Sequence, residues 1–382
     1  MSARPRRVSV CSGRASKGAA ISISALVATV GILALLGSIG QSQVAAPPAG
    51  QPPITITAGG TYSGNWTSTS ITPAVRISTA EPVVIRNSTI TNRSGGPLVV
   101  TDWPLAVNVT LRRVKAFGGN GRFFDAEGFR SIRIENCTID KTAGIKIAQG
   151  VAGASVVITR NKQRNVHGPT QGASGLRQFV QLAEVQTATV DISWNEVVNT
   201  FGKSEVEDVI SIYKSAHAKV HDNYLQGGYP FTNVGDSSTN GITVEVGDGV
   251  GPTSFDNEIW NNIIVDNVGG IGLVGGHDNY AHDNRIVQDG KLDDGSTLRA
   301  ANVGLAVWNI GRFSGFVNNR AQRNVVGFVH AGGYRNDFWF PDAPGDYSRN
   351  TPRRGRITRT TEQAERKAWL AKLAKHRIRI GV

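Results

Sequence analysis

A phrase of the form apolar-x-apolar-x-x-Asn-x-apolar recurs along the chain and constrains the fold more than any other feature of the sequence. Apolar residues two positions apart indicate a strand with one buried face. A polar turn residue at constant phase means that successive strands end alike, so each copy predicts one coil of a solenoid. The copies place these residues in the turn position: Ser88, Val114, Cys137, Asn161, Asn195, Asn223, Asn262, Asn284 and Asn319.

The spacing of the copies sets the size of a coil. The shortest repeats are about 22 to 24 residues long, which suits three short strands and three turns. Stacked Asn side chains form hydrogen bonds along such a stack, as amide ladders do in other in-register parallel arrays. We therefore expect an all-β parallel solenoid of about nine or more coils, with three strands in each coil.

The net charge of +12 arises from 41 Lys and Arg residues against 29 Asp and Glu residues. Residues 1–18 hold five basic residues and no acid, and residues 349–382 hold eleven basic residues and two acids. The remainder of the chain therefore carries a small negative net charge. Because the solenoid is not basic, we do not expect it to bind nucleic acid.

The first 56 residues resemble an export segment rather than part of the solenoid. Residues 1–18 form a basic start, and residues 19–40 are uncharged and largely apolar. An apolar run of about 20 residues reaches the length that spans a bilayer, and either a signal peptide or a membrane anchor fits it. The Pro-rich residues 41–56 predict a stiff linker. We expect an exported protein, secreted, periplasmic or anchored, with membrane contact only through residues 19–40.

The basic C-terminal tail, residues 346–382, departs from the repeat. Residues 361–375 predict a short helix, because Trp369, Leu370 and Leu373 stand at helical spacing. One interpretation is a helix that caps the open end of the solenoid, followed by a solvated charged terminus. The other is a segment that attaches to an anionic envelope surface or polymer.

Parallel strands, three to a coil and with Asn at one turn, resemble the right-handed parallel β-helix proteins of the pectate-lyase-like superfamily, over residues 57–345. The resemblance implies that the Asn turn separates the second and third strands and that substrate lies on the outer face of the first strands. It places first strands at 145–147, 180–182, 210–212, 242–244, 271–273 and 305–307, with a last one near Phe328. The active-site motifs of pectate lyases and polygalacturonases are missing from the sequence, so the resemblance implies no specific activity.

Inserted residues accumulate at one corner of the predicted coils. Four insertions, at 164–175, 201–208, 229–240 and 289–302, lie between third and first strands, and residues 247–253 follow a first strand. Loops on one corner form walls beside one face, which is where repeat proteins often bind their ligands. The sequence therefore predicts a groove over the first strands.

The outward residues of the first strands supply the candidate site. With the alternate apolar residues inside, Tyr213, Glu245, Val274 and Trp308 form one exterior row. A carboxylate between aromatic rings suits a saccharide, because rings stack on sugar faces and a carboxylate binds hydroxyls or moves a proton. The candidate catalytic residues are Tyr213, Glu245, His277 and Lys214, and the candidate substrate-binding residues are Trp308, Asp208, Thr243 and His330.

Several alternatives accompany these assignments. The exterior row has an equally simple interpretation as a mixed surface without function. Loop acids provide oxygen ligands that suit calcium, although solvated acids explain them as well; the candidate metal ligands are Glu205, Glu207, Asp208 and Asp248. An Asp208–Glu245 acid pair is disfavoured, because strand spacing separates their backbones by about 16 Å. His221 and His282 precede the Asn turn and are interpreted as structural.

These features favour an exported protein that binds a polysaccharide in the groove, as a lyase, hydrolase or epimerase with no required cofactor beyond an optional calcium ion. The alternative is a non-catalytic surface, adhesion or structural protein that uses the same scaffold. Uronate elimination needs a base at the sugar and a cation beside its carboxylate. Tyr213 or His277 fits the first role, and Lys214 or calcium fits the second.

Overall fold

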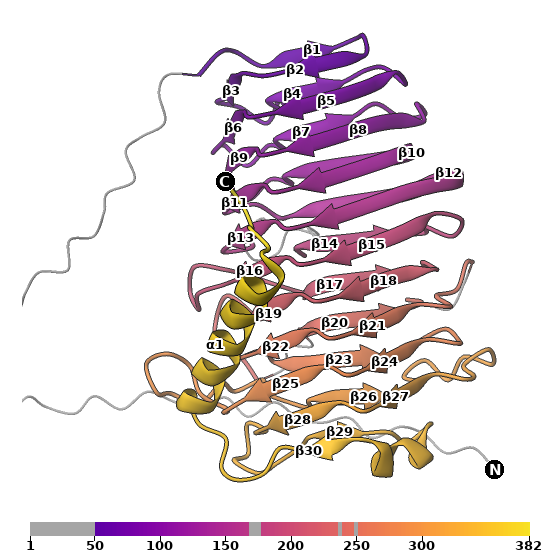
Figure 1. Ribbon diagram of the computed structural model, residues 1–382, viewed down its shortest axis with the longest axis vertical. Coiled ribbons are helices and arrows are strands. Elements are labelled where there is room, and N and C mark those ends of the chain that lie inside the picture. Colours follow the sequence, from indigo (N-terminus) through magenta and orange to yellow (C-terminus); the bar gives the residue numbers. More distant parts are fainter. Residues whose placement is uncertain (1–49, 168–176, 236–238, 248–250) are drawn as a thin grey trace, which may run out of the picture. The chain divides into compact units, whose positions relative to one another are not determined.

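The computed structural model describes residues 50–167, 177–235, 239–247 and 251–382. Parallel strands stack into a β-solenoid with three strands to a coil, as the sequence predicts (Figure 1). The first and second strands of the coils belong to one large sheet, and the third strands form a separate eleven-stranded sheet within the described residues. Alternating residues fill the interior, and Ile210, Ile212, Ile242 and Val244 are fully buried.

The strands fall into three sets. First strands are β1(Ile54–Ile56), β4(Val75–Ile77), β7(Val99–Thr101), β14(Val180–Ala183), β17(Asp208–Tyr213), β20(Asn240–Glu245), β23(Gly269–Leu273), β26(Leu305–Val307) and β29(Phe338–Trp339). Second strands are β2(Gly60–Tyr62), β5(Pro82–Arg86), β8(Val107–Arg112), β15(Thr189–Ser193), β18(Ala218–His221), β21(Glu258–Trp260), β24(Tyr280–His282) and β27(Arg320–Gln322). In two coils the first and second strands are continuous, as β10(Phe124–Glu135) and β12(Ile145–Thr159).

Third strands are β3(Asn65–Ser68), β6(Thr89–Asn92), β9(Lys115–Gly118), β11(Thr138–Asp140), β13(Lys162–Arg164), β16(Glu196–Val198), β19(Tyr224–Gln226), β22(Ile263–Val265), β25(Arg285–Gln288), β28(Val325–Phe328) and β30(Thr351–Pro352). Phe328 therefore belongs to a third strand, and the prediction of a first strand there is wrong. The last first strand is β29, which pairs with β26. The solenoid begins at Ile54, slightly before the predicted start.

The predicted Asn ladder is present at the turn between second and third strands. In each step the backbone N–H and the side-chain amide of one Asn donate to Oδ1 of the next, as Asn195 does to Asn223 at 3.0 Å. The residue before each Asn of the ladder as far as Asn324 is left-handed, for example Trp194 at φ 58° and Asp222 at φ 52°. The ladder connects Asn161, Asn195, Asn223, Asn262, Asn284, Asn324 and Asn350.

The placement of Asn319 in this ladder is wrong. Asn319 belongs to a second ladder with Asn257 and Asn279, at the turn between first and second strands. Asn324 takes the predicted position five residues later, after β27. The error arose because Phe316, Asn319 and Ala321 imitate the repeat phrase, and it hid an insertion of residues 308–319 between β26 and β27.

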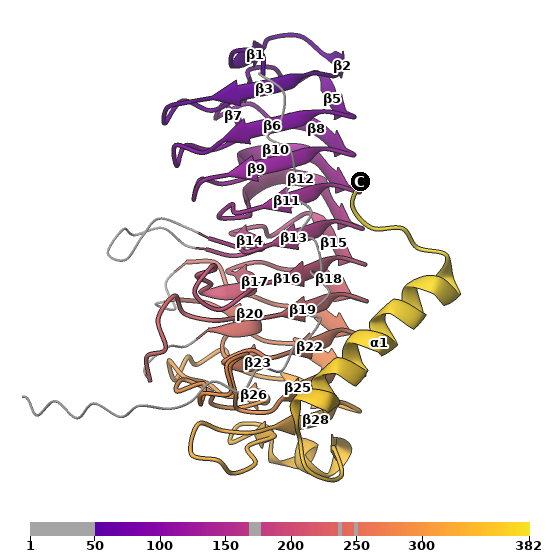
Figure 2. The same cartoon turned by 90° about the vertical axis from the view of Figure 1, so that its left-hand side faces the viewer.

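The C-terminal helix α1(Arg359–His376) does not cap the open end of the solenoid. It crosses the outer face of the third-strand sheet beside β22 and β25 (Figures 1 and 2). A short 3-10 helix, Pro344–Arg349, and β30 lead into it. Trp369 is fully buried against Tyr224, Ile263 and Val265. The apolar spacing identified the helix, but the spacing does not specify which surface the helix covers.

The predicted export segments, residues 1–18 and 19–40, lie outside the described residues. Among the residues that the structure does describe, no helix is both long and apolar enough to cross a membrane. The signal peptide and membrane anchor therefore remain predictions.

Candidate functional site

Two adjoining clefts lie on the outer face of the first strands, where the sequence predicts a groove. The first has a volume of about 700 Å³ and the second about 240 Å³, and Glu207 and Glu245 line both. The inserted segments stand between third and first strands as predicted, because β16 ends at Val198 before β17, and β19 ends at Gln226 before β20. On the opposite side, Ile310 and Phe313 of the 308–319 insertion line the second cleft. We call the two clefts together the groove.

The predicted exterior row is present in the groove. Tyr213 and Glu245 are paired neighbours in β17 and β20. Trp308 follows Val307, which pairs with Leu273, so it extends the row through Val274. Trp308 is 40% exposed and lines the second cleft. A second outward row runs beside this one, two residues earlier in each strand, and in it Ser211 pairs with Thr243.

Asp208 is the most strongly perturbed acid of the groove. It is buried at the start of β17, and its Oδ1 accepts a hydrogen bond from the backbone N–H of Asn240 at 2.9 Å. Burial and then the charge of Glu245 raise the pKa of Asp208 to about 8, although the hydroxyl of Thr243 partly opposes the shift. Asp208 is therefore protonated at neutral pH. Thr243, a predicted binding residue, supports this acid and lines the second cleft.

Glu245 and Glu207 bring two further carboxyl groups to the same place. Burial raises the pKa of Glu245, and the charge of Glu207 adds to the increase. Burial also raises the pKa of Glu207 against the charges of Arg177 and Arg122. Neutral groups donate the hydrogen bonds to these acids: Ser211 Oγ donates to Glu245 Oε1 at 3.2 Å and Gln178 Nε2 donates to Glu207 Oε2 at 2.5 Å.

Asp208 and Glu245 interact in the structure, contrary to the prediction from backbone separation along the strand. The side chain of Glu245 turns back two residues to reach Ser211. The two carboxyl groups are consequently close enough for the charge of Glu245 to raise the pKa of Asp208. Both line the second cleft.

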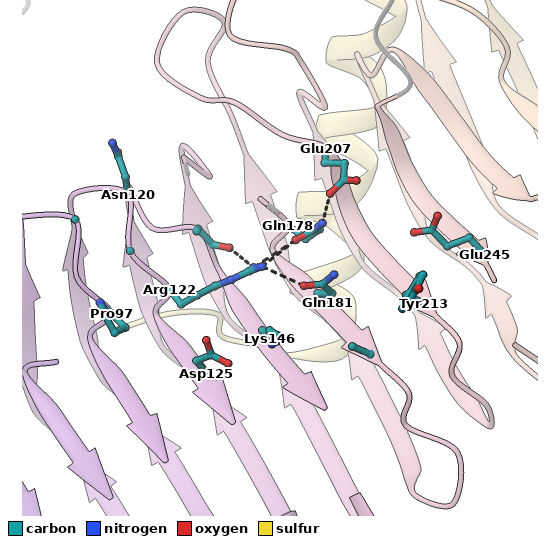
Figure 3. A pocket seen from close by; sticks show the side chains of 14 residues that line it. Pro97, Asn120, Arg122, Asp125, Lys146, Gln178, Gln181, Glu207, Tyr213 and Glu245 are labelled. Atoms are coloured by element: carbon teal, nitrogen blue, oxygen red, sulfur yellow. Dashed lines mark hydrogen bonds between the residues drawn. The ribbon is translucent and has the colours of Figure 1, made fainter. Parts of the chain in front are cut away.

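Arg122 is the main groove residue that the sequence analysis missed. Its guanidinium donates to Ala143 O at 2.7 Å, to Gln178 Oε1 at 3.3 Å and to Gln181 Oε1 at 3.1 Å, beside Glu207 (Figure 3). Burial lowers the pKa of Arg122 to about 10, and the charges of Asp125 and Glu207 oppose this shift. The predicted first strands began at Ile145, one coil too late to include Arg122. Counting back by one more coil from Ile145 would have included Arg122 among the groove residues.

Other predicted residues are distributed differently. Lys214 is buried and places its Nζ 5.1 Å from the centre of the Tyr213 ring, within the range of a cation–π contact. His277 stacks on Phe255 with ring centres 5.2 Å apart, and its Nδ1 is 2.7 Å from Asp278 Oδ2. His330 stacks on Tyr334 in a loop after β28. Neither histidine lines the two clefts.

The predicted calcium ligands do not converge in the described part of the chain. Glu205 forms an ion pair with Arg177, whereas Glu207 and Asp208 accept hydrogen bonds from Gln178 and Asn240. Within the ranges 50–167, 177–235, 239–247 and 251–382, no group of three or more His, Cys, Asp or Glu side chains is arranged to hold a metal ion. Asp248 lies outside the described residues, so its part in a calcium site stays a prediction.

Comparison with known proteins adds no family assignment. No protein-family profile matches the chain, and no curated protein is significantly similar to it in sequence.

Proposed function

We propose that this chain is an exported, right-handed β-helix protein of the pectate-lyase-like type that binds a polysaccharide in the groove and cleaves it by acid–base chemistry. The observation that carries the proposal is the meeting of Glu207, Asp208 and Glu245, all with raised pKa values, in one cleft. Titratable groups with perturbed pKa values gather at functional sites more often than on ordinary surfaces.

The chemistry of the groove supports a division of roles. Asp208 holds a proton at neutral pH and is suited to protonate the glycosidic oxygen as the bond to the sugar carbon breaks. Glu245 is suited to accept a proton, either from an attacking water or from the sugar ring. The guanidinium of Arg122 supplies positive charge where an anion is bound or develops. Tyr213 and Trp308 provide ring faces on which sugars stack.

The test uses the purified full chain and a panel of neutral and uronate polysaccharides. New reducing ends report hydrolysis, and ultraviolet absorbance of unsaturated uronates reports elimination. We expect product from at least one polymer with the wild type and none above background with Glu245→Gln. Glu127→Gln is the matched control, because Glu127 occupies the same exterior row through Ala148 and Ala183 but does not line the clefts.

The outcomes separate the two functions that the sequence leaves open. Retention of a polymer without product would leave the non-catalytic surface or adhesion protein as the correct assignment. A protein that neither retains nor cleaves any polymer would refute the proposal.

A further inference from the structure

Five arginines line a cleft at a different edge of the solenoid, where second strands turn into third strands in the early coils. Arg112, Arg113 and Arg160 come from the solenoid, and Arg377 and Arg379 come from the segment after α1. The cleft has a volume of about 400 Å³. We call these five residues the arginine corner.

The C-terminal segment is attached to this edge without help from its arginine side chains. Asn136 Nδ2 donates to Arg379 O at 2.8 Å, and the backbone N–H of Gly381 donates to Arg160 O at 2.8 Å. The backbone N–H of Val382 also donates to Thr138 Oγ1 at 2.9 Å. Because these bonds hold the segment in place, attachment does not explain the two arginines.

The arginine corner holds five guanidinium groups, against which stand the carboxylate of Glu135 and that of Val382, which lines the same cleft. Glu135 is shared, at 3.1 Å from Arg112 Nε and 3.0 Å from Arg160 Nη2. Arg133 also approaches Glu135, at 3.7 Å. Among the described residues, the guanidiniums of Arg113, Arg377 and Arg379 form no ion pair or hydrogen bond. Like charges that line one cleft repel one another, so the arrangement favours a bound anion.

Backbone conformation also does not explain the arginines. Arg113 and Arg160 occupy the left-handed turn position at φ 56° and 59°, which Asn136, Asn261 and Asp283 fill in other coils. Asn and Asp suit this conformation because their short side chains bond locally, whereas a long side chain gains nothing from it.

The other large residues in this turn position have evident contacts. Arg323 pairs with Asp283 at 2.7 Å, and Trp194 packs on Trp369. Arg113 has no such partner in the described structure. Its unexplained charge is consistent with a ligand outside the chain.

We propose that the arginine corner binds phosphate groups, supplied by a free polyphosphate or by a phosphodiester polymer. Guanidinium presents paired N–H donors that match the oxygens of a phosphate. Arg113 and Arg160 are two coils apart, roughly 10 Å, so the cleft spans more than one phosphate. A volume of 400 Å³ lies within the usual range for ligand sites. The site is separate from the groove and does not depend on the proposed polysaccharide cleavage.

The test is calorimetric titration of the full chain with tripolyphosphate at low and moderate salt. We expect Arg113→Gln/Arg377→Gln/Arg379→Gln to weaken binding at least tenfold. The control Arg299→Gln/Arg354→Gln/Lys367→Gln removes the same charge from exposed positions elsewhere and should change affinity less than twofold. Added salt should weaken binding to the wild type more than to the cleft variant. If the triple variant fails to fold, Arg113→Gln alone serves as the test, and it should weaken tripolyphosphate binding about threefold.

Further titrations separate the phosphate sources. Tighter binding of a glycerol phosphate polymer than of tripolyphosphate would identify a polymer as the ligand, and the reverse order would identify free polyphosphate. Equal losses in the cleft and control variants, equal binding of polyglutamate, or no binding of tripolyphosphate would each overturn the proposal.

Discussion

The groove over the first strands and the flank under α1 both bury acidic side chains, but they satisfy them differently. On the flank, Glu196 meets Arg366 and Arg164, each at 2.8 Å, and Trp369 Nε1 donates to it at 3.1 Å. Burial raises the pKa of Glu196, yet these bonds and charges outweigh burial, so its pKa is lowered. In the groove, Asp208 and Glu245 meet amides and hydroxyls, and their pKa values are raised. Paired acids hold a structure together, whereas acids left with neutral partners keep a proton available for chemistry.

The flank also contains one pair that resembles the groove. Asp266 and Glu362 share Arg359, with Nη1 distances of 2.7 and 3.0 Å. Burial and then the charge of Asp266 raise the pKa of Glu362 to about 8. Helix α1 covers these acids, so no substrate reaches them. A raised pKa therefore points to function only where the acid lines an open cleft, as Asp208 and Glu245 do.

The largest expected effect is on catalysis in the groove. Glu245→Gln should reduce the rate of polysaccharide cleavage by about 10² to 10⁴-fold, the usual contribution of a positioned acid or base. The free energy of unfolding should stay the same or rise, because burial and the charge of Glu207 disfavour the ionised carboxylate that the substitution removes. Initial rates test the loss of cleavage, and urea unfolding curves test the effect on stability. A loss of stability comparable to the loss of rate would show that Glu245 is structural.

On the flank, the largest effect should be on stability. Trp369→Ala removes a fully buried ring and should lower the free energy of unfolding by about 3 to 5 kcal/mol. Leu370→Ala is the neighbouring control, since Leu370 is 49% exposed and its loss should change stability by less than about 0.5 kcal/mol. Denaturant unfolding measures both. Similar values for the two variants would contradict the packing of α1 on the third strands.

Neutralising one acid in each region should give opposite results. Glu196→Gln leaves Arg366 and Arg164 without a carboxylate and should cost about 2 to 3 kcal/mol, less than a fully buried pair because both arginines are partly exposed. Asp208→Asn should leave stability nearly unchanged at pH 4 and increase it at pH 7, because the unfolded wild-type chain ionises Asp208 above its ordinary pKa of 3.8 while the folded protein keeps the proton up to about pH 8. Unfolding curves at the two pH values test this. Equal losses in both variants would remove the distinction between groove and flank.

The smallest expected effect is a pH dependence of stability at His221. Burial lowers its pKa, but hydrogen bonds to Asp191 and Asp222 outweigh burial and raise it to about 9, above the ordinary 6.5. The folded protein therefore holds a proton that the unfolded chain releases. The resulting stabilisation is full below pH 6.5 and is lost as pH rises through 9, by about 1 to 2 kcal/mol after allowance for partial exposure.

The contribution of His221 is measured as the difference in unfolding free energy between the wild type and His221→Gln. The raised pKa values of Asp208 and Glu362, each about 8 in the folded protein, also make the free energy of unfolding fall as pH rises toward 8. Subtracting the unfolding free energies of His221→Gln from those of the wild type at each pH isolates the histidine. A difference that does not change between pH 6 and 10 would contradict the shift.

Much of the architecture was predictable because it repeats. A period-2 apolar pattern and a turn residue at constant phase determine register, and register places Tyr213 beside Glu245 and the insertions on one corner. The prediction failed at Asn319, which matches the repeat phrase but lies at a different turn. It also missed Arg122, because the predicted first strands began one coil after it. The proximity of Asp208 to Glu245 was missed because it depends on how a side chain turns, which backbone spacing does not describe.

The sequence by itself determined a parallel solenoid with an Asn ladder and a loop-walled first-strand face, because strand alternation and coil length are local properties. Only the tertiary structure decided which surface α1 covers, which acids obtain arginine partners, and where arginines far apart in the chain meet. These outcomes depend on contacts between coils and the C-terminal segment, such as Arg366 with Glu196 and Gly381 with Arg160. A charge in the sequence carries no information about its partner until the fold brings the two together.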